Sequence, residues 1–161
     1  TRVVRRSEAL LALRQESYGS NFTYQEHAYH KSWLSAVSSL LLTGLSVLVL
    51  LSPLKRLVKP FLPKPGEGPS EAVQENGWFD CKFIAESEDG TKSVFNMHGK
   101  GDPGYKVTSK LVSECALCLI EDIEELPGGR GYGGVLTSAS GLGHSLISRL
   151  TKVGIDFKGP L

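Results

Sequence analysis

Cysteine and histidine are the residues of this chain best suited to metal binding or redox chemistry. Cys115 and Cys118 have the spacing of a redox pair or of half a zinc site. They fall on the apolar stripe of an expected helix, and with 3 cysteines in the chain no second pair completes a metal site. The histidines show no ligand spacing: His27, His30, His98 and His144. We therefore expect core cysteines and no metal.

A glycine pattern near the end of the chain is similar to a dinucleotide-binding turn. Gly141 and Gly143 follow an expected short strand and precede an expected helix, but the third glycine of the fingerprint is replaced by Leu146. That glycine is needed for close packing between helix and strand. The sequence therefore predicts an ordinary tight turn and no cofactor-binding residue in this chain.

A second glycine-containing turn opens an expected helix. Asp102 suits the N-cap and Pro103 the first helical position, where its missing N–H costs nothing. Exposed N–H groups at such an end can receive an anion, and simple capping is the alternative. The candidate anion- or substrate-facing residues are Gly101, Asp102, Gly104 and Tyr105. No catalytic residue is assigned.

Composition limits the classes of protein that fit. The chain has 161 residues, of which 40% are hydrophobic and 22% charged, with a net charge of +1. This excludes intrinsic disorder and argues against nucleic-acid binding, which needs a concentrated basic surplus. Because the chain starts at Thr1 and has its single methionine at Met97, we expect a fragment or a processed form.

The longest uncharged stretch runs from Trp33 to Leu51, with basic residues on both sides. A helix of that length spans about 28 Å, close to the thickness of the hydrocarbon core of a bilayer. We expect it to associate with a membrane or a lipid droplet, and a helix buried in a protein core is the alternative. The residues assigned to this role are Trp33, Leu40, Leu41, Leu42, Leu45, Leu48, Leu50, Leu51, Lys55 and Arg56.

Hydrophobic periodicity predicts the remaining elements. We expect a surface helix over 3–16, a strand over 22–30, a basic and proline-rich linker over 55–75 and a hairpin over 78–98 that turns at Asp89-Gly90. A helix from Pro103 to about Ile123, a short strand over 134–138, a helix over 144–153 and a last strand over 155–157 follow. This order predicts an α/β or α+β domain with a mixed sheet.

The segments KGDPGYKVTSKLVSECALCLI, GGVLTSASGLGHSLISRLTKVGIDF and YGSNFTYQE together resemble the C-terminal part of the saccharopine dehydrogenase-like oxidoreductases. The most specific element is the turn from Gly101 to Tyr105 with the helix that follows. The family's usual Gly-Gly-Val-x-Thr-Pro differs here, because Thr137 is followed by Ser138. The resemblance covers nearly the whole chain.

This resemblance implies an N-terminal Rossmann domain that binds NAD(P) and lies outside the chain, so that the chain alone is inactive. It also implies a lipid droplet or an intracellular membrane, on the cytosolic side, as the location. The partners expected are that surface, the Rossmann domain and a second copy in a homodimer. The alternative function is a non-catalytic scaffolding protein on a lipid surface.

The expected organisation is one α/β domain interrupted by the apolar segment. Residues 1–31 begin the domain, 32–54 form the apolar segment, 55–75 form the linker and 76–161 complete the domain. If the strand over 22–30 shares a sheet with the hairpin, both flanks of the apolar segment lie in one compartment. A full crossing of a membrane is then excluded, and the segment is expected to enter and leave on the same side.

Overall fold

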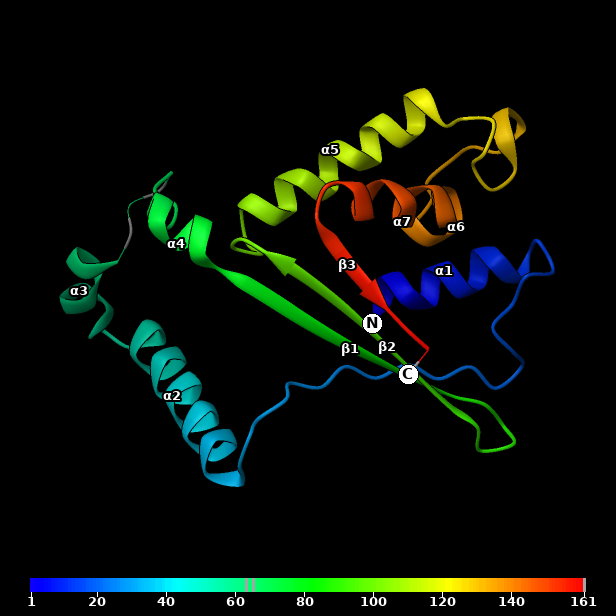
Figure 1. The fold of residues 1–161 in the computed structure, drawn as a ribbon. Coiled ribbons are helices and arrows are strands. Elements are labelled where there is room, and N and C mark those ends of the chain that lie inside the picture. Colours follow the sequence, from blue (N-terminus) through cyan, green and yellow to red (C-terminus); the bar gives the residue numbers. More distant parts are fainter. Residues whose placement is uncertain (63, 65, 161) are drawn as a thin grey trace. The chain divides into compact units, whose positions relative to one another are not determined.

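A computed structural model describes residues 1–62, 64 and 66–160 of the chain. Pro63 and Pro65, which belong to the expected linker, and Leu161 lie outside the described residues. The chain divides into two compact units: Thr1–Tyr24 with Pro69–Leu161, and Gln25–Gly68. The first unit, termed the sheet unit, contains every strand found among the described residues (Figure 1).

The sheet has the order β1-β2-β3, and both pairs of neighbours are antiparallel. Its strands are β1 (Trp78–Glu86), β2 (Lys92–Lys100) and β3 (Ile155–Lys158). Alternating apolar residues in β1 and β2, joined by a turn in which Gly90 has φ +83°, make the predicted hairpin. The predicted mixture of helices and strands is therefore confirmed, but the described sheet is antiparallel throughout instead of mixed.

Helices of the sheet unit lie on one side of this sheet, as the ribbon shows (Figure 1): α1 (Arg2–Ala12), α5 (Lys106–Glu121), α6 (Ser138–Gly141) and α7 (Gly143–Lys152). A short helix α4 (Glu71–Asn76) leads into the start of β1, and a 3₁₀ turn η2 (Gly129–Gly131) lies between α5 and α6. The helix α7 ends where Gly154 takes φ +88°, a left-handed conformation that suits a residue without a side chain. The predicted helices before β3 are thus confirmed with shifts of a few residues at their ends.

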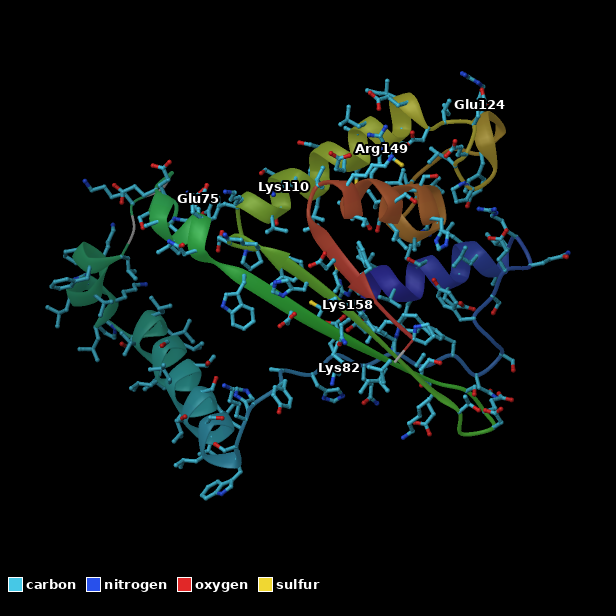
Figure 2. The ribbon with its side chains drawn as sticks, viewed as in Figure 1. Glu75, Lys82, Lys110, Glu124, Arg149 and Lys158 are labelled. Carbon is cyan, nitrogen blue, oxygen red and sulfur yellow. The ribbon has the colours of Figure 1, made fainter. Side chains whose placement is uncertain are left out.

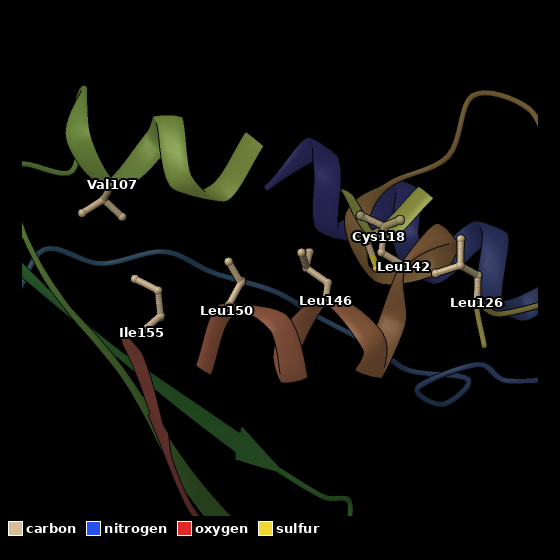
Figure 3. Packing of buried hydrophobic residues seen from close by; sticks show 7 residues of the cluster. All are labelled: Val107, Cys118, Leu126, Leu142, Leu146, Leu150 and Ile155. Atoms are coloured by element: carbon tan, nitrogen blue, oxygen red, sulfur yellow. The ribbon is translucent and has the colours of Figure 1, made fainter. Parts of the chain in front are cut away.

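The core lies where α5 and α7 meet the sheet (Figure 3). Val107 and Ile155 are each 1% exposed, and burial of such a side chain contributes about 1.5–3 kcal/mol. The ring of Phe79 lies over Gly99, its cross-strand partner, where any side chain would collide with it. The buried cluster consists of Val107, Cys118, Leu126, Leu142, Leu146, Leu150 and Ile155.

The second unit is built around α2 (Trp33–Leu51). Ser32 caps it through a reciprocal pair of hydrogen bonds with Ser35, and the boundaries match those predicted. A single helical turn α3 (Lys55–Val58) and a 3₁₀ turn η1 (Lys59–Phe61) follow. Pro60 lies at the start of η1, where its ring prevents α3 from continuing as a regular α-helix.

Two predicted strands are absent from the described residues. Residues 22–30 form no regular structure. Both faces of that segment mix polar and apolar side chains, so neither face gains enough by burial to hold it in a sheet. The argument that both flanks of the apolar segment share one sheet therefore loses its premise.

The predicted strand over 134–138 is likewise a loop that ends in α6. Thr137 and Ser140 cap each other's backbone N–H groups and start a helix there.

The apolar stripe predicted for the helix from Pro103 to about Ile123 includes Val112 and Leu119, and it is wider than the buried face of α5. Val112 and Leu119 are more than half exposed, because they lie beyond the strip that faces α7 and the sheet.

Candidate functional site

The most concentrated group of charges in the sheet unit lies between α5 and α7, and we call it the Arg149 cluster. Arg149 extends from α7 toward α5, as Figure 2 shows. Its guanidinium donates to Glu114 at 3.4 Å and to Asp122 at 3.2 Å, and it also donates to Glu121. The side chains of Arg149 and Glu114 are only 15% and 13% exposed. One arginine thus joins two carboxylates of α5 and the carboxylate of Asp122, which caps the end of that helix.

The pKa shifts within this cluster follow from those hydrogen bonds. The guanidinium of Arg149 holds the pKa of Asp122 below its ordinary value, and the carboxylates of Asp122 and Glu121 raise the pKa of Arg149. Asp122 and Arg149 therefore stay charged near neutral pH. Their pair acts as a lasting ionic contact between the end of α5 and α7.

A cavity of about 350 Å³ opens beside the cluster. Four carboxylates face two cations around it, so its character is acidic. Because Arg149 is already shared among carboxylates, it has little capacity left for an anionic ligand. The lining residues are Glu114, Glu121, Asp122, Glu125, Ser145, Ser148, Arg149, Lys152 and Val153. The cluster serves chiefly to bind α5 to α7.

Sequence reasoning missed the Arg149 cluster. Glu114, Glu121 and Asp122 recur at spacings of seven and eight residues, which places them on one face of a helix. That spacing is a usable signal for a charged face. The partner Arg149 could not be identified, because it lies 27–35 residues further along the chain.

The turn predicted to face an anion is occupied by its own carboxylate. Asp102 accepts a hydrogen bond from the N–H of Tyr105 at 2.7 Å, and its carbonyl accepts one from Val107 at 2.9 Å. Gly101 adopts φ +113° and donates to the carbonyl of Gly77. Gly104 lies beside the Asp102 carboxylate, with which a side chain there would be in tight contact. The structure brings these four residues together as a capped turn, and anion binding by them stays a prediction.

The glycine pattern around Gly141 has no strand before it. Gly141 ends α6, and Gly143 begins α7 with φ +52° against Pro127. A dinucleotide site needs a strand, a glycine turn and a helix in succession. The residues around Gly141 and Gly143 form no such unit, and the absence of nucleotide binding by this chain alone stays a prediction.

The cysteine pair is part of the core. Cys118 is fully buried and Cys115 packs against the buried cluster. Burial raises the pKa of Cys115, and burial together with the nearby Asp122 raises that of Cys118 to about 11. A thiolate is the reactive form, so both thiols are poor nucleophiles. Among the described residues no group of histidine, cysteine and acidic side chains could hold a metal ion.

The apolar segment forms α2 as predicted, and no residue of α2 is buried. It is the one described helix long and apolar enough to cross a membrane, judged by length and composition alone. Next to it, Lys55 and Arg56 line a shallow hollow with Leu50, Lys59 and Leu62. The residues assigned to lipid contact from the sequence therefore lie together in the second unit.

Comparison with known proteins gives relatives over nearly the whole chain. A protein named "Putative trans-acting enoyl reductase" from Mycobacterium tuberculosis is 37% identical over 98% of the chain. Proteins named trans-acting enoyl reductase from Mycobacterium leprae and Mycobacterium ulcerans are 32% and 31% identical over 96% of it. The chain spans 38% of the length of the first relative and 37% of the other two.

No model of a known protein family matches the chain, and no solved structure matches it. The names of the relatives correct the interpretation drawn from the sequence. They point to enoyl reduction and away from a saccharopine dehydrogenase-like protein of membranes or lipid droplets, so that prediction of family and function is wrong. An oxidoreductase stays compatible with these names. The chain is thus similar to somewhat more than a third of a trans-acting enoyl reductase.

Proposed function

We propose that this chain forms part of an enoyl reductase and contributes a region that does not itself bind the nucleotide. The observation that carries this proposal is the identity of 37% with one such relative over 98% of the chain. The relatives from two further species support it, because they match nearly the same share of the chain, 96%.

The geometry supports this division of roles. Reduction of an enoyl double bond requires a hydride, which in many reductases comes from a nicotinamide cofactor. The described residues form a small antiparallel sheet and lack the strand–turn–helix unit that holds such a cofactor. We therefore propose that NAD(P)H is bound by residues outside this chain.

A chimera tests the proposed function. The segment of the Mycobacterium tuberculosis relative that matches this chain is replaced by Thr1–Leu161, and oxidation of NADPH and NADH is followed with 2-enoyl thioesters of several chain lengths. We expect the chimera to reduce the same thioesters as the unmodified relative. The same chimera with Leu150→Asp, which buries a charge in the core, is the inactive control.

Two results would contradict the proposal. One is a folded chimera that reduces no thioester which the unmodified relative reduces. The other is saturable binding of NADPH or NADH to Thr1–Leu161 alone in a calorimetric titration, because it would place the nucleotide site inside this chain. We expect no heat of binding in that titration.

A further inference from the structure

The outer edge of β1 carries main-chain groups that no other strand of the described sheet pairs. Gly101 donates to the carbonyl of Gly77, and Ser87 donates to that of Thr91, so the odd-numbered residues of β1 hydrogen-bond to β2. The even-numbered residues alternate with them. They therefore direct their N–H and C=O groups away from β2, toward the free edge: Trp78, Asp80, Lys82, Ile84 and Glu86.

The side chains along this edge are unusually apolar for an exposed strand. Trp78 and Ile84 are both 64% exposed, and Phe83 is nearly half exposed. Trp78 also stacks on His98 of β2, with 6.5 Å between ring centroids, which restricts its orientation. A long edge strand with exposed apolar residues favours pairing with another strand.

The residue order of β1 is self-complementary in one antiparallel register. When Cys81 lies opposite Cys81 of a second copy, Asp80 lies opposite Lys82, Phe79 opposite Phe83 and Trp78 opposite Ile84. By symmetry each of these pairs occurs twice. Opposite charges and aromatic pairs across two strands each stabilise a sheet.

The neighbouring registers are disfavoured by charge. Outward-directed residues must meet outward-directed residues, so the pairing can slip only in steps that keep even positions opposite even positions. One such step places Asp80 opposite Asp80, and the other places Lys82 opposite Lys82. Like charges directly opposite each other destabilise a strand pair. Of these three registers, only the one centred on Cys81 places opposite charges against each other, and it also pairs more of β1 than a register shifted further along the strand.

We infer that β1 is a dimerisation strand through which two copies of this chain join their sheets. The two β1 strands pair antiparallel about Cys81 and form one sheet with the order β3-β2-β1-β1-β2-β3. Cys81 then occupies a non-hydrogen-bonded pair, in which opposed Cα atoms approach to about 4.5 Å. That distance suits a disulfide, so Cys81, an exposed free thiol, reports on the contact.

Charge exchange at two positions tests the dimer. The chain Thr1–Leu161 is kept in mild detergent because α2 is fully exposed, and its mass is measured by sedimentation over a range of concentrations. We expect a dimer whose dissociation constant rises about tenfold or more in Asp80→Lys and in Lys82→Asp, since both symmetric charge pairs become repulsive. The double variant Asp80→Lys/Lys82→Asp restores opposite charges and is expected to dimerise like the unmodified chain.

The double variant also separates the interface from the strand's own contacts. Asp80 accepts a hydrogen bond from His98 within its own chain, and the double variant loses this bond while regaining the pairs across the interface. Dimerisation that stays weak in a folded double variant would overturn the proposal. So would an unmodified chain that is monomeric at every concentration.

Disulfide formation tests the register. Oxidation with copper phenanthroline in air is expected to link two chains through Cys81, and Cys81→Ser removes the link. In the Cys81→Ser background, neither Phe79→Cys nor Phe83→Cys is expected to link with itself, but a mixture of the two variants is, because positions 79 and 83 face each other.

Disulfides mapped to other cysteines, or equal linking of Phe83→Cys with itself, would overturn the register. Cys81 that resists a small maleimide in the folded monomer would show that another segment of this chain covers the edge. That result would overturn the proposal as well. A lipid vesicle or an added peptide that binds β1 in place of the second copy would do the same.

Discussion

The helices α2 and α5 are of similar length but bury their apolar residues to very different degrees. The helix α2 is uncharged and strongly apolar on average, and none of its residues is buried. The helix α5 is less apolar on average, yet Val107 and Cys118 lie fully inside the core. The comparison shows that the amount of apolar surface does not decide burial. Burial requires a stripe of matching width and a neighbouring element that supplies the complementary surface.

The difference extends to the way each helix is held. In the sheet unit, α5 and α7 are joined by the core and by the Arg149 cluster, so contacts between elements stabilise both. In the second unit, α2 depends on its own backbone hydrogen bonds and on the cap at Ser32. Substitutions of the same kind in the two regions should therefore have unequal effects on the free energy of unfolding.

The largest contrast is expected from matched leucine truncations. Leu150→Ala in α7 removes a side chain that is 5% exposed, and it should lower the free energy of unfolding of the sheet unit by about 3 kcal/mol. Leu48→Ala in α2, at a site that is 67% exposed, should change it by less than about 0.5 kcal/mol. Urea unfolding followed by Trp78 fluorescence in a Trp33→Phe background measures the sheet unit. Equal losses in the two variants would refute the contrast.

A smaller contrast is expected from the two capping boxes. Thr137 caps α6 and also contacts the hydroxyl of Ser7 in α1 at 2.7 Å, so Thr137→Ala should cost about 1–2 kcal/mol. Ser32→Ala should fray the start of α2 and leave the unfolding of the sheet unit unchanged.

Circular dichroism reports on α2 and urea unfolding on the sheet unit. Thr137→Ser keeps the hydroxyl and should behave nearly as the unmodified chain does. A loss in Thr137→Ser as large as that in Thr137→Ala would show that the hydroxyl is not what matters.

The smallest effect is expected in the dependence of stability on pH. Arg149 lowers the pKa of Asp122 in the folded chain, so the ion pair stabilises the fold above the ordinary carboxyl pKa of about 3.9. This stability is lost as the pH falls through the lowered pKa. Arg149→Met should therefore flatten the decline in stability between about pH 4 and pH 2.

The control is Lys92→Met, which removes an exposed partner of Glu86. Surface pairs contribute little, so its pH profile should match that of the unmodified chain. Midpoints of urea unfolding, measured at several pH values, give the pH dependence of stability for both variants and for the unmodified chain. A profile of Arg149→Met that is parallel to the unmodified one would exclude the ion pair as the cause.

Local signals in the sequence predicted most elements. The boundaries of α2 were predicted because an uncharged run lies between basic residues, and the hairpin was predicted because Asp89-Gly90 separates two alternating runs. The end of α7 was predicted to within a residue, because Gly154 follows the apolar periodicity and suits the left-handed turn found there. Each of these signals depends on residues that lie close together in the chain.

Features that depend on distant partners were not predicted. Alternation over 22–30 was taken for a strand, but a strand also needs a neighbour, and the sequence does not identify one. Residues 134–138 were predicted as a strand instead of a loop, because Thr137 was not recognised as the N-cap of a helix. The Arg149 cluster forms only because α5 and α7 lie side by side in the fold.

The family resemblance was wrong for a different reason. Motifs shared with a family do not determine which reaction a protein catalyses.

The placement of β3 has a consequence for the order of folding. The strands β1 and β2 are joined by a turn of a few residues, whereas Ile155 of β3 reaches Gly99 of β2 only after the chain has passed through α5, α6 and α7. Closing that roughly tenfold longer loop costs about 2 kcal/mol more in chain entropy. The hairpin is therefore expected to form first, and the sheet gains its third strand only when α7 docks and brings β3 with it. Until then β2 keeps an open edge, and pulsed hydrogen exchange should find the amides that pair β2 with β3 protected last.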